Sequence, residues 1–423
     1  MTDFILFIRI HVLGPIVIEI YLAAGILVAL FVGYNIGGAT TGVSFGPAVG
    51  AKVLSKVGAA VLMSIFFFLG GWIVGPAVVE TLGDGIVAEG IMTLETGIAI
   101  LFFIGLALFA GNLFGVPAST SMTAVGAIAG LGLATGTLNW ATMGEIVSWW
   151  VVAPVIAFWI SGVIGRYFYP QINEWVAISR RETHLWVVER TGLIPTVAVQ
   201  EGTDKREITG SLLVVAIGCY MAFSSGASNV ANAVAPLVGS DALDYPLDLS
   251  VAGLTTTIGN MEWGVIIAGI AVTIGAFTIA RRTLETMGND ITNLPLTAAV
   301  IVMTVSATIV TALSAIGIPV QLVIVATMSI VGLGWGRATR TTTVSDAVSG
   351  KDEAGVSVGA LTAEKEGEPA PAIGEEDPAD IPKASDLFDP STTGRVILIQ
   401  NFVPVLATIG AFLTFRFVPI FGF

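Results

Sequence analysis

The sequence predicts an all-α polytopic membrane protein made of two related halves. Three observations support this fold class: a low content of charged residues, many long apolar runs, and a set of motifs that occurs twice. Charged residues make up 12% of the 423 residues, and the mean hydropathy is +0.88. Soluble globular proteins carry about 25% charged residues, so this composition favours a lipid environment.

The apolar runs are distributed along almost the whole chain. A transmembrane helix needs roughly 20 consecutive, mainly apolar residues, and several runs reach or approach this length. They predict a multi-pass protein of the cell membrane. The runs cover residues 58–79, 95–111, 145–165, 210–223, 264–280, 296–315, 317–335 and 396–420.

Two polar segments interrupt these runs and define the predicted organisation. A connector holds six Lys and Arg residues, so the positive-inside rule places it in the cytoplasm. The stretch 351–390 is acidic and rich in Pro and Ala, which indicates a disordered loop. The predicted parts are a transmembrane repeat at 1–165, the connector at 166–209, a second repeat at 210–336, the acidic cytoplasmic loop at 337–393 and a final transmembrane helix at 394–423.

Three pairs of segments show that the chain repeats itself. Residues 37–50 match 225–239, residues 80–87 match 285–292, and residues 115–136 match 317–338. The pairs occur in the same order and at similar offsets, which indicates duplication. Two membrane halves with Gly- and Pro-interrupted polar stretches at corresponding places are typical of secondary transporters, whose discontinuous helices bind the substrate near the midplane.

Composition and motifs argue against other classes of function. The chain has a formal charge of −13 and no basic patch, so no nucleic-acid partner is expected. Its two histidines are far apart, and no protease, esterase or P-loop motif is present. We therefore expect no catalytic residues, no metal site beyond a coupling ion, and no enzyme activity.

The first polar stretch contains Thr40 and Thr41 between glycines, with Asn35 just before them. Threonine hydroxyls can donate to an anion, and glycine lets backbone approach a ligand. The alternative is helix packing, because glycines recur every four residues from Gly38 to Gly50 and small residues at that spacing form close contacts.

The second polar stretch covers residues 224–239. Ser225, Ser228, Asn229 and Asn232 fall on roughly one face of a helix. Amides are costly in lipid unless they have partners, so the stretch predicts a binding site. The alternative is hydrogen bonding between helices.

The third stretch places Ser119, Thr120 and Ser121 directly after a Gly-Val-Pro sequence, before an apolar run that is short for a membrane span. This pattern suggests a re-entrant hairpin whose helix start binds an anion. An ordinary Ser/Thr helix cap is the alternative. The matching segment of the second half keeps Pro319 but loses the hydroxyls, which predicts a scaffold with Gln321 as its one polar candidate.

Glu19 is the most isolated acid near an apolar run, and carboxylates inside membranes are usually functional. It is therefore a candidate for coupling transport to an ion. Glu80 and Glu285 occupy matching positions of the two repeats, where local salt bridges are the simpler interpretation.

Three segments of the chain resemble motifs of the inorganic phosphate transporter (PiT) family. Residues 226–239 (GASNVANAVAPLVG) are similar to the second copy of that family's signature, and residues 116–130 (VPASTSMTAVGAIAG) look like its hairpin motif. Residues 281–292 (RRTLETMGNDIT) are similar to the segment that follows the second signature. The resemblance implies two inverted-topology repeats with re-entrant helical hairpins, and phosphate symport driven by Na⁺ or, in some members, H⁺.

The resemblance also implies roles for individual residues. Asn229 and Thr40 stand where the family has Asp, and Met122 replaces a His, so the coupling ion is left open between Na⁺, H⁺ and none. Sodium, if used, is expected at Asn229 and Asn232. The implied substrate-binding residues are Ser119, Thr120, Ser121, Ser225, Gly226, Ser228, Thr40 and Thr41, and the ion-coupling candidates are Asn229, Asn232, Asn35 and Glu19.

The sequence thus predicts a secondary active transporter that imports inorganic phosphate by cation-coupled alternating access. Its expected partners are phosphate and the lipid bilayer, and a homodimer is left open. Three alternatives stay open as well: a passive anion channel, a transporter of another oxyanion such as sulfate, and a sensor or scaffold that does not transport.

Overall fold

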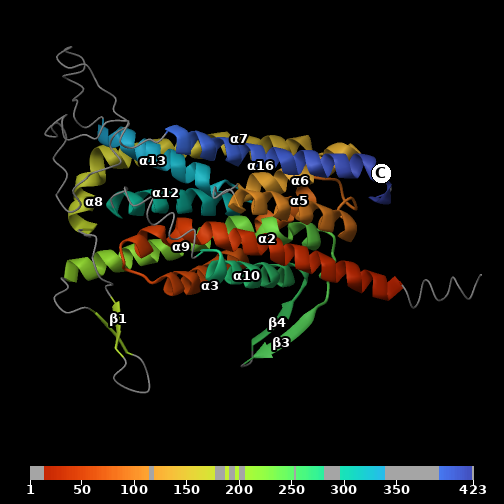
Figure 1. The fold of residues 1–423 in the computed structure, drawn as a ribbon, viewed down its shortest axis with the longest axis horizontal. Coiled ribbons are helices and arrows are strands. Elements are labelled where there is room, and N and C mark those ends of the chain that lie inside the picture. Colours follow the sequence, from red (N-terminus) through yellow and green to blue (C-terminus); the bar gives the residue numbers. More distant parts are fainter. Residues whose placement is uncertain are drawn as a thin grey trace, which may run out of the picture.

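The computed structural model is a bundle of helices that run roughly side by side (Figure 1). Seven described segments are long and apolar enough to cross a membrane: Glu19–Gly50, Lys56–Ile73, Leu94–Asn112, Trp140–Asn173, Ile208–Val238, Asn260–Thr278 and Leu296–Ala315. The structure describes residues 14–113, 119–176, 186–189, 196–199, 205–251, 254–280, 296–338 and 390–421. The repeat segment 285–292 and nearly all of the predicted acidic loop lie outside these residues.

Local sequence signals set several helix ends in the first half. Ser55 caps one helix by accepting from the Gly58 N–H at 3.0 Å, and Asn139 caps another. Gly136 ends a helix with a left-handed φ of 72°, which glycine adopts without strain. The elements are α2 (Gly14–Gly50), α3 (Lys56–Ile73), α4 (Gly75–Glu80), η2 (Thr81–Gly85), α5 (Leu94–Leu113), α6 (Thr120–Thr135), α7 (Trp140–Val163), η3 (Ile164–Phe168) and α8 (Tyr169–Val176).

The second half adds helices and two short hairpins of antiparallel strands. The helical elements are α9 (Lys205–Val238), α10 (Asn260–Thr278), α12 (Leu296–Ala315), α13 (Leu322–Ala338), α16 (Pro390–Phe417) and η5 (Pro419–Phe421). The strands are β1 (Trp186–Glu189), β2 (Thr196–Val199), β3 (Leu247–Val251) and β4 (Leu254–Ile258).

The two hairpins are a feature that the all-α prediction missed. Trp186 lies opposite Val199 in one hairpin, which falls within the predicted connector, and Leu247 lies opposite Ile258 in the other. Both contain several Val, Ile or Thr residues, which favour strands. Each hairpin has only two strands and lies to one side of the helical bundle (Figure 1). The protein is therefore mostly, but not entirely, helical.

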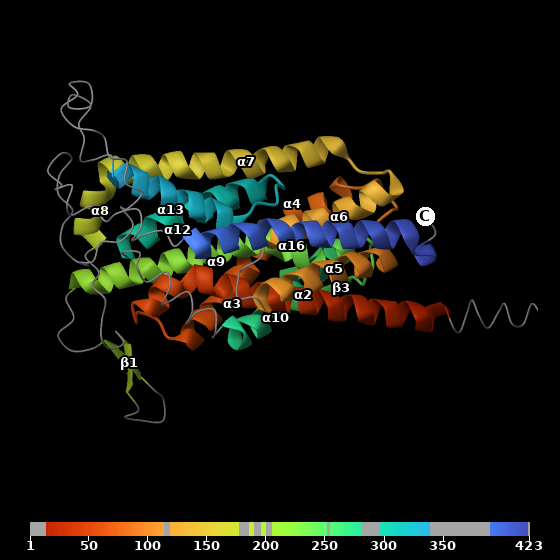
Figure 2. The same cartoon turned by 45° about the horizontal axis from the view of Figure 1, so that its top comes forward.

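Two short helices distinguish this bundle from a simple set of spanning helices. Helix α6 has 16 residues and α13 has 17, which is short for a bilayer crossing, and each follows a 20-residue helix. Figures 1 and 2 show α5 and α6 towards one end of the bundle, and α12 and α13 towards the other. In the same views α2 and α9 run past each other in opposite directions.

The main helix contacts come in matched pairs. Helix α2 packs against α5 and α10, while α9 packs against α12 and α3. Helix α6 packs against α16, and α13 packs against α7. Glycine allows two of these contacts to be close: a Cβ on Gly37 would overlap the Val272 carbonyl, and a Cβ on Gly226 would overlap the Phe67 carbonyl.

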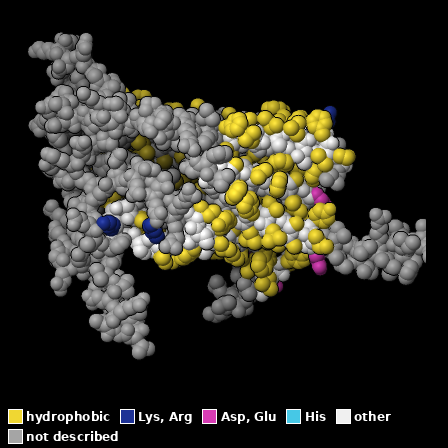
Figure 3. Space-filling model, viewed as in Figure 1, with side chains coloured by type: hydrophobic (Ala, Val, Ile, Leu, Met, Phe, Trp, Pro, Cys, Tyr) yellow, Lys and Arg dark blue, Asp and Glu magenta, His cyan; other side chains and the backbone are white. Residues whose placement is uncertain are grey.

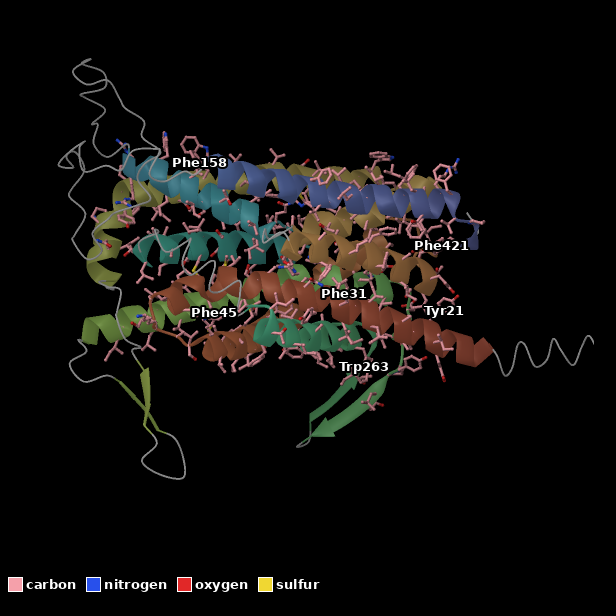
Figure 4. The ribbon with its side chains drawn as sticks, viewed as in Figure 1. Tyr21, Phe31, Phe45, Phe158, Trp263 and Phe421 are labelled. Atoms are coloured by element: carbon pink, nitrogen blue, oxygen red, sulfur yellow. The ribbon has the colours of Figure 1, made fainter. Side chains whose placement is uncertain are left out.

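The outer surface has the character expected of a lipid-facing bundle. Hydrophobic side chains cover much of the visible helical face in Figure 3, and Leu27 and Ile73 are 66% and 65% exposed. Figure 4 shows Tyr21 and Trp263 towards one end, where aromatic residues with a polar group suit a membrane interface. Phe45, also on α2, lies towards the other end.

Candidate functional site

A cavity lies where α2, α6, α9 and α13 meet in the middle of the bundle. The space between its lining atoms, including its open side, is about 430 Å³. Both short helices begin at this cavity, and they come from opposite halves of the chain. It is lined by Ala39, Thr40, Val43, Ser119, Thr120, Asn229, Gln321, Leu322 and Val323.

The start of α6 presents a capped helix terminus to the cavity. The backbone of Ser119 is extended, and its hydroxyl accepts from the Met122 N–H at 3.3 Å. Its carbonyl accepts the first helical hydrogen bond, from the Thr123 N–H at 3.1 Å. A helix N-terminus carries partial positive charge and free N–H groups, so this end favours an anion. The predicted break at Pro117 lies outside the described residues.

The start of α13 presents a second helix terminus to the same cavity. The Gln321 carbonyl accepts from the Val325 N–H at 3.2 Å, which makes Gln321 the counterpart of Ser119. The Gln321 side chain is 6% exposed, and neither its Oε1 nor its Nε2 has a hydrogen-bond partner among the described residues. Trp150 of α7 donates from Nε1 to the Pro319 carbonyl at 2.8 Å and holds this helix start in place. We call residues 119–121 the α6 tip and residues 319–322 the α13 tip.

Asn229 connects the α6 tip to α9. Its Oδ1 accepts from the Thr120 hydroxyl and, at 3.1 Å, from Asn232 Nδ2. Its own Nδ2 donates to the Ser225 carbonyl at 2.9 Å and to the Ser225 hydroxyl at 3.2 Å. Asn232 Nδ2 also donates to the Ser121 hydroxyl at 3.3 Å, and Asn232 Oδ1 is buried without a partner in the described structure.

The Val320 carbonyl joins the second tip to the first half of the site. It accepts from the Ser121 hydroxyl at 3.1 Å and from the Ser228 hydroxyl at 3.0 Å. Ser121 lies on α6 and Ser228 on α9. One backbone oxygen just before α13 therefore accepts from two other helices around the cavity. Both serines are buried, at 1% and 0% exposed.

The structure brings most of the predicted site residues together. Thr40, Ser119, Thr120 and Asn229 line the cavity itself. Ser121, Ser225, Ser228 and Asn232 form the hydrogen-bond network directly behind them.

Four predicted residues are not brought to the cavity. The Thr41 hydroxyl donates to the Gly37 carbonyl of its own helix at 2.7 Å, and Gly226 packs against α3. Asn35 accepts from Asn112 of α5 at 2.9 Å, so it joins two helices elsewhere. Glu19 is exposed near the start of α2, at the first residue of the candidate membrane span Glu19–Gly50, and it does not line the cavity.

Gln321 is the polar lining residue that the site prediction left out. The sequence reading treated its half as a scaffold because the hydroxyls of the first hairpin are missing there. The repeat match of residues 115–136 with 317–338 places Gln321 at the position of Ser119, and this correspondence was the signal that pointed to it.

The cavity is electrically neutral on its protein side. None of its described lining residues carries a charge. The Thr40 hydroxyl donates to the Ile36 carbonyl at 2.8 Å and the Thr120 hydroxyl donates to Asn229, so the side-chain donors left for a ligand are the Ser119 hydroxyl and the Gln321 amide, beside the helix N–H groups. In the described part of the chain, no group of three or more His, Cys, Asp or Glu could hold a metal ion. The arrangement suits an oxygen-rich anion, whose oxygens accept from neutral donors.

Comparison with known proteins identifies the family. A model of the Phosphate transporter family matches residues 36–355. The Sulfate permease CysP of Bacillus subtilis (strain 168) is 33% identical over 315 residues, which cover 74% of this chain and 77% of that protein. A Thermococcus kodakarensis protein named "Putative phosphate permease TK2061" is 25% identical over 376 residues, covering 77% of this chain and 91% of its own length.

The fold also has a known counterpart. A solved structure titled "The sodium-dependent phosphate transporter" superposes with a TM-score of 0.60 at 18% identity, covering 94% of this chain and 100% of that one. This likeness concerns the fold. With the apolar helices, the family match leads to one conclusion: the chain is a multi-pass membrane protein that belongs to the Phosphate transporter family.

Proposed function

We propose that this protein imports a tetrahedral oxyanion across the cell membrane by cation-coupled alternating access. The observation that carries the proposal is the neutral cavity at which α6 and α13 both begin. Hydroxyls and helix N–H groups there can replace the hydration shell of an anion. Phosphate is the first candidate, because the family is described as phosphate transporters.

Sulfate is the second candidate, and two observations favour it. The relative at 33% identity is named a sulfate permease. The described lining also lacks a carboxylate, with Asn229 in the position where the phosphate transporter signature has Asp.

The proposal includes two inverted repeats with re-entrant hairpins. The matched packing supports it: α2 with α10 corresponds to α9 with α3, and α6 with α16 corresponds to α13 with α7. The opposite directions of α2 and α9 are also expected if the second half is inverted (Figures 1 and 2). In this arrangement the two re-entrant helical hairpins, α5–α6 and α12–α13, enter the membrane from opposite sides and meet at the cavity.

Oxygen atoms behind the cavity are the candidates for binding the coupling cation. Asn229, Asn232, Ser121 and Ser228 contribute side-chain oxygens, and Val320 contributes a carbonyl. Hard cations prefer oxygen ligands. The fold neighbour is named sodium-dependent, which makes Na⁺ the first cation to test and H⁺ the second.

The charge distribution supports one orientation. Lys52 and Lys56 lie at the turn between α2 and α3, at the end opposite to the start of α2. Visible acidic side chains in Figure 3 lie at the end where α2 begins. By the positive-inside rule, the α2–α3 turn faces the cytoplasm. A homodimer is not needed to complete the cavity, because one chain supplies all of its described lining.

Uptake into proteoliposomes tests the proposal. Purified protein is reconstituted, and uptake of radiolabelled phosphate and of radiolabelled sulfate is measured with Na⁺ present or replaced by choline, at two pH values. The variant Ser119→Ala/Thr120→Val removes two lining hydroxyls, and Thr327→Val is its control because Thr327 is exposed on α13 and bonds to its own helix. We expect saturable, cation-dependent uptake that falls about tenfold or more in the double variant and stays unchanged in the control.

Other outcomes would contradict the proposal in distinct ways. Anion flux that runs down its own gradient without any cation dependence would indicate a passive channel. Equal uptake by empty liposomes and by wild-type protein, together with no anion-dependent thermal shift, would indicate a protein that does not transport.

A further inference from the structure

We propose that Gln321 binds the transported anion and that its neutral amide makes the site prefer sulfate over phosphate. Sulfate is a tetrahedral dianion without an acidic proton, whereas phosphate is protonated. The inference rests on the proposed oxyanion transport and decides between its two candidates. It gives a role to a residue of the half whose hydroxyls are missing.

Position is the first argument. Gln321 and Ser119 match in the sequence repeat, and each carbonyl accepts the first hydrogen bond of its short helix. Both side chains line one cavity. A ligand that contacts the α6 terminus through Ser119 therefore lies between two helix starts, and Gln321 is the polar side chain that α13 offers to it.

The unsatisfied amide is the second argument. Gln321 is only 6% exposed, and both its Oε1 and its Nε2 lack a hydrogen-bond partner within the described structure. A buried polar group without a hydrogen bond is costly, so such groups usually have a partner in the working protein. Ser119 already accepts from its own helix, whereas Gln321 does not cap α13. The Gln321 amide is thus free to donate to a ligand in the cavity.

The chemistry of the donors is the third argument. Near neutral pH phosphate still carries at least one O–H group, which is best accommodated by an anionic acceptor, because charge-assisted hydrogen bonds are roughly twice as strong as neutral ones. Sulfate carries no proton and needs only donors. In the cavity Asn229 Oδ1 already accepts from Thr120 and Asn232. No described lining residue is a carboxylate, so a proton on the ligand has no charged acceptor there.

The charged residues around the cavity in the described structure do not supply an acceptor for a proton on the ligand, because none of them lines the cavity. The four helices around the cavity carry charged residues only near their ends, and these do not line the cavity. The described elements packed against these helices carry further charged residues, none of which lines the cavity. They are Lys56, Glu80, Asp84, Glu95, Glu145, Arg166, Glu174, Glu262, Arg395 and Arg416. The charged residues of the four cavity helices are Glu19, Lys205, Arg206, Glu207 and Arg337, and their other titratable residues are Tyr21, Tyr34, Cys219 and Tyr220.

Transport selectivity provides the test. The KM for radiolabelled sulfate and for radiolabelled phosphate is measured in proteoliposomes at pH 6 and pH 8 for wild type, Gln321→Leu and Gln321→Glu. Gln171 of α8 is an exposed glutamine, so Gln171→Leu and Gln171→Glu are matched controls. The ratio of the two KM values does not depend on how much of a sample is folded, so reduced stability of a variant does not obscure the result.

We expect wild type to have the lower KM for sulfate, and Gln321→Leu to raise that KM about 10- to 100-fold through loss of a hydrogen bond to a charged ligand. Gln321→Glu keeps the size of the side chain but adds a charged acceptor. Its preference for sulfate over phosphate should therefore fall at least about tenfold, with phosphate favoured more at pH 6 than at pH 8. The Gln171 variants should keep the wild-type ratio.

Three results would overturn the inference, and they differ in what they leave standing. If wild type carries either anion but both Gln321 variants keep its KM ratio, the role of Gln321 is wrong while oxyanion transport stands. If wild type prefers phosphate, the selectivity argument fails even if Gln321→Leu weakens uptake. If wild type carries neither anion, the proposed function fails together with this inference.

Discussion

The two helix tips at the cavity have matching backbones and different chemistry. The α6 tip acts through side chains: Ser119 caps its helix, Thr120 donates to Asn229, and Ser121 donates to the Val320 carbonyl. The α13 tip acts through its backbone: the Val320 carbonyl accepts twice, and the Pro319 carbonyl accepts from Trp150. Gln321 is its one polar side chain at the cavity.

This difference shows how two helix starts with similar backbones can have different roles at one cavity. Both tips supply a helix N-terminus, which depends only on backbone geometry and so survives the loss of the hydroxyls. One tip has the hydroxyls, of which Ser121 donates to the Val320 carbonyl of the other tip. The site is asymmetric in its chemistry although its helices pack in matched pairs.

The largest expected effect comes from Asn229, which the α6 tip contacts directly. Asn229→Leu leaves the Thr120 hydroxyl without its acceptor and removes one acceptor of Asn232, and each unsatisfied buried group costs about 1–3 kcal/mol. We expect anion uptake to fall about 100-fold. Uptake and thermal unfolding in detergent measure this, with Asn112→Leu as the control because Asn112 contacts Asn35, away from the cavity. Similar losses in both variants would mean that Asn229 has only a packing role.

The hydrogen bonds of α6 and α9 to the Val320 carbonyl of the α13 tip are tested by Ser121→Ala and Ser228→Ala. Each variant leaves the Val320 carbonyl with one donor, so each should cost about 1 kcal/mol of unfolding free energy. The double variant leaves that carbonyl with neither serine, so its cost should exceed the sum of the two. Chemical unfolding of the four proteins gives the coupling energy. Strict additivity would show that the two serines do not share the carbonyl.

The support of the second tip alone is tested by Trp150→Phe. This change keeps an aromatic ring but removes the donor to the Pro319 carbonyl, so we expect a loss of about 1 kcal/mol and a few-fold slower uptake. Trp159→Phe is the control, because Trp159 is 55% exposed. If Trp150→Phe changes neither stability nor uptake, the α13 tip is held by packing and not by this hydrogen bond.

The smallest effect is expected at Glu19, outside both tips. Glu19 is exposed near the start of α2, away from the cavity. Glu19→Gln should therefore leave the rate and the cation dependence of uptake within about twofold of wild type, as is usual for surface substitutions. Loss of cation dependence in this variant would restore the coupling role that the sequence suggested for Glu19.

The sequence predicted the site residues best where the motif and the repeat agreed. Thr40, Ser119, Thr120 and Asn229 were all chosen from polar stretches in apolar runs, and the structure brings all four to one cavity. Thr41 and Gly226 come from the same stretches, but their helices turn them away from it. A motif names a segment of helix, whereas the rotation of that helix against its neighbours decides which of its faces lines a cavity.

The sequence by itself determined the lipid environment and the family, and it predicted a duplication. Low charge, long apolar runs and paired motifs are properties of residue order, and they need no coordinates to be recognised. Only the tertiary structure decided that Ser119 and Gln321, about 200 residues apart in sequence, line the same neutral cavity. The physical reason is that the donors and acceptors of this site lie on four helices, and their pairing is fixed by packing between those helices and not by local preference.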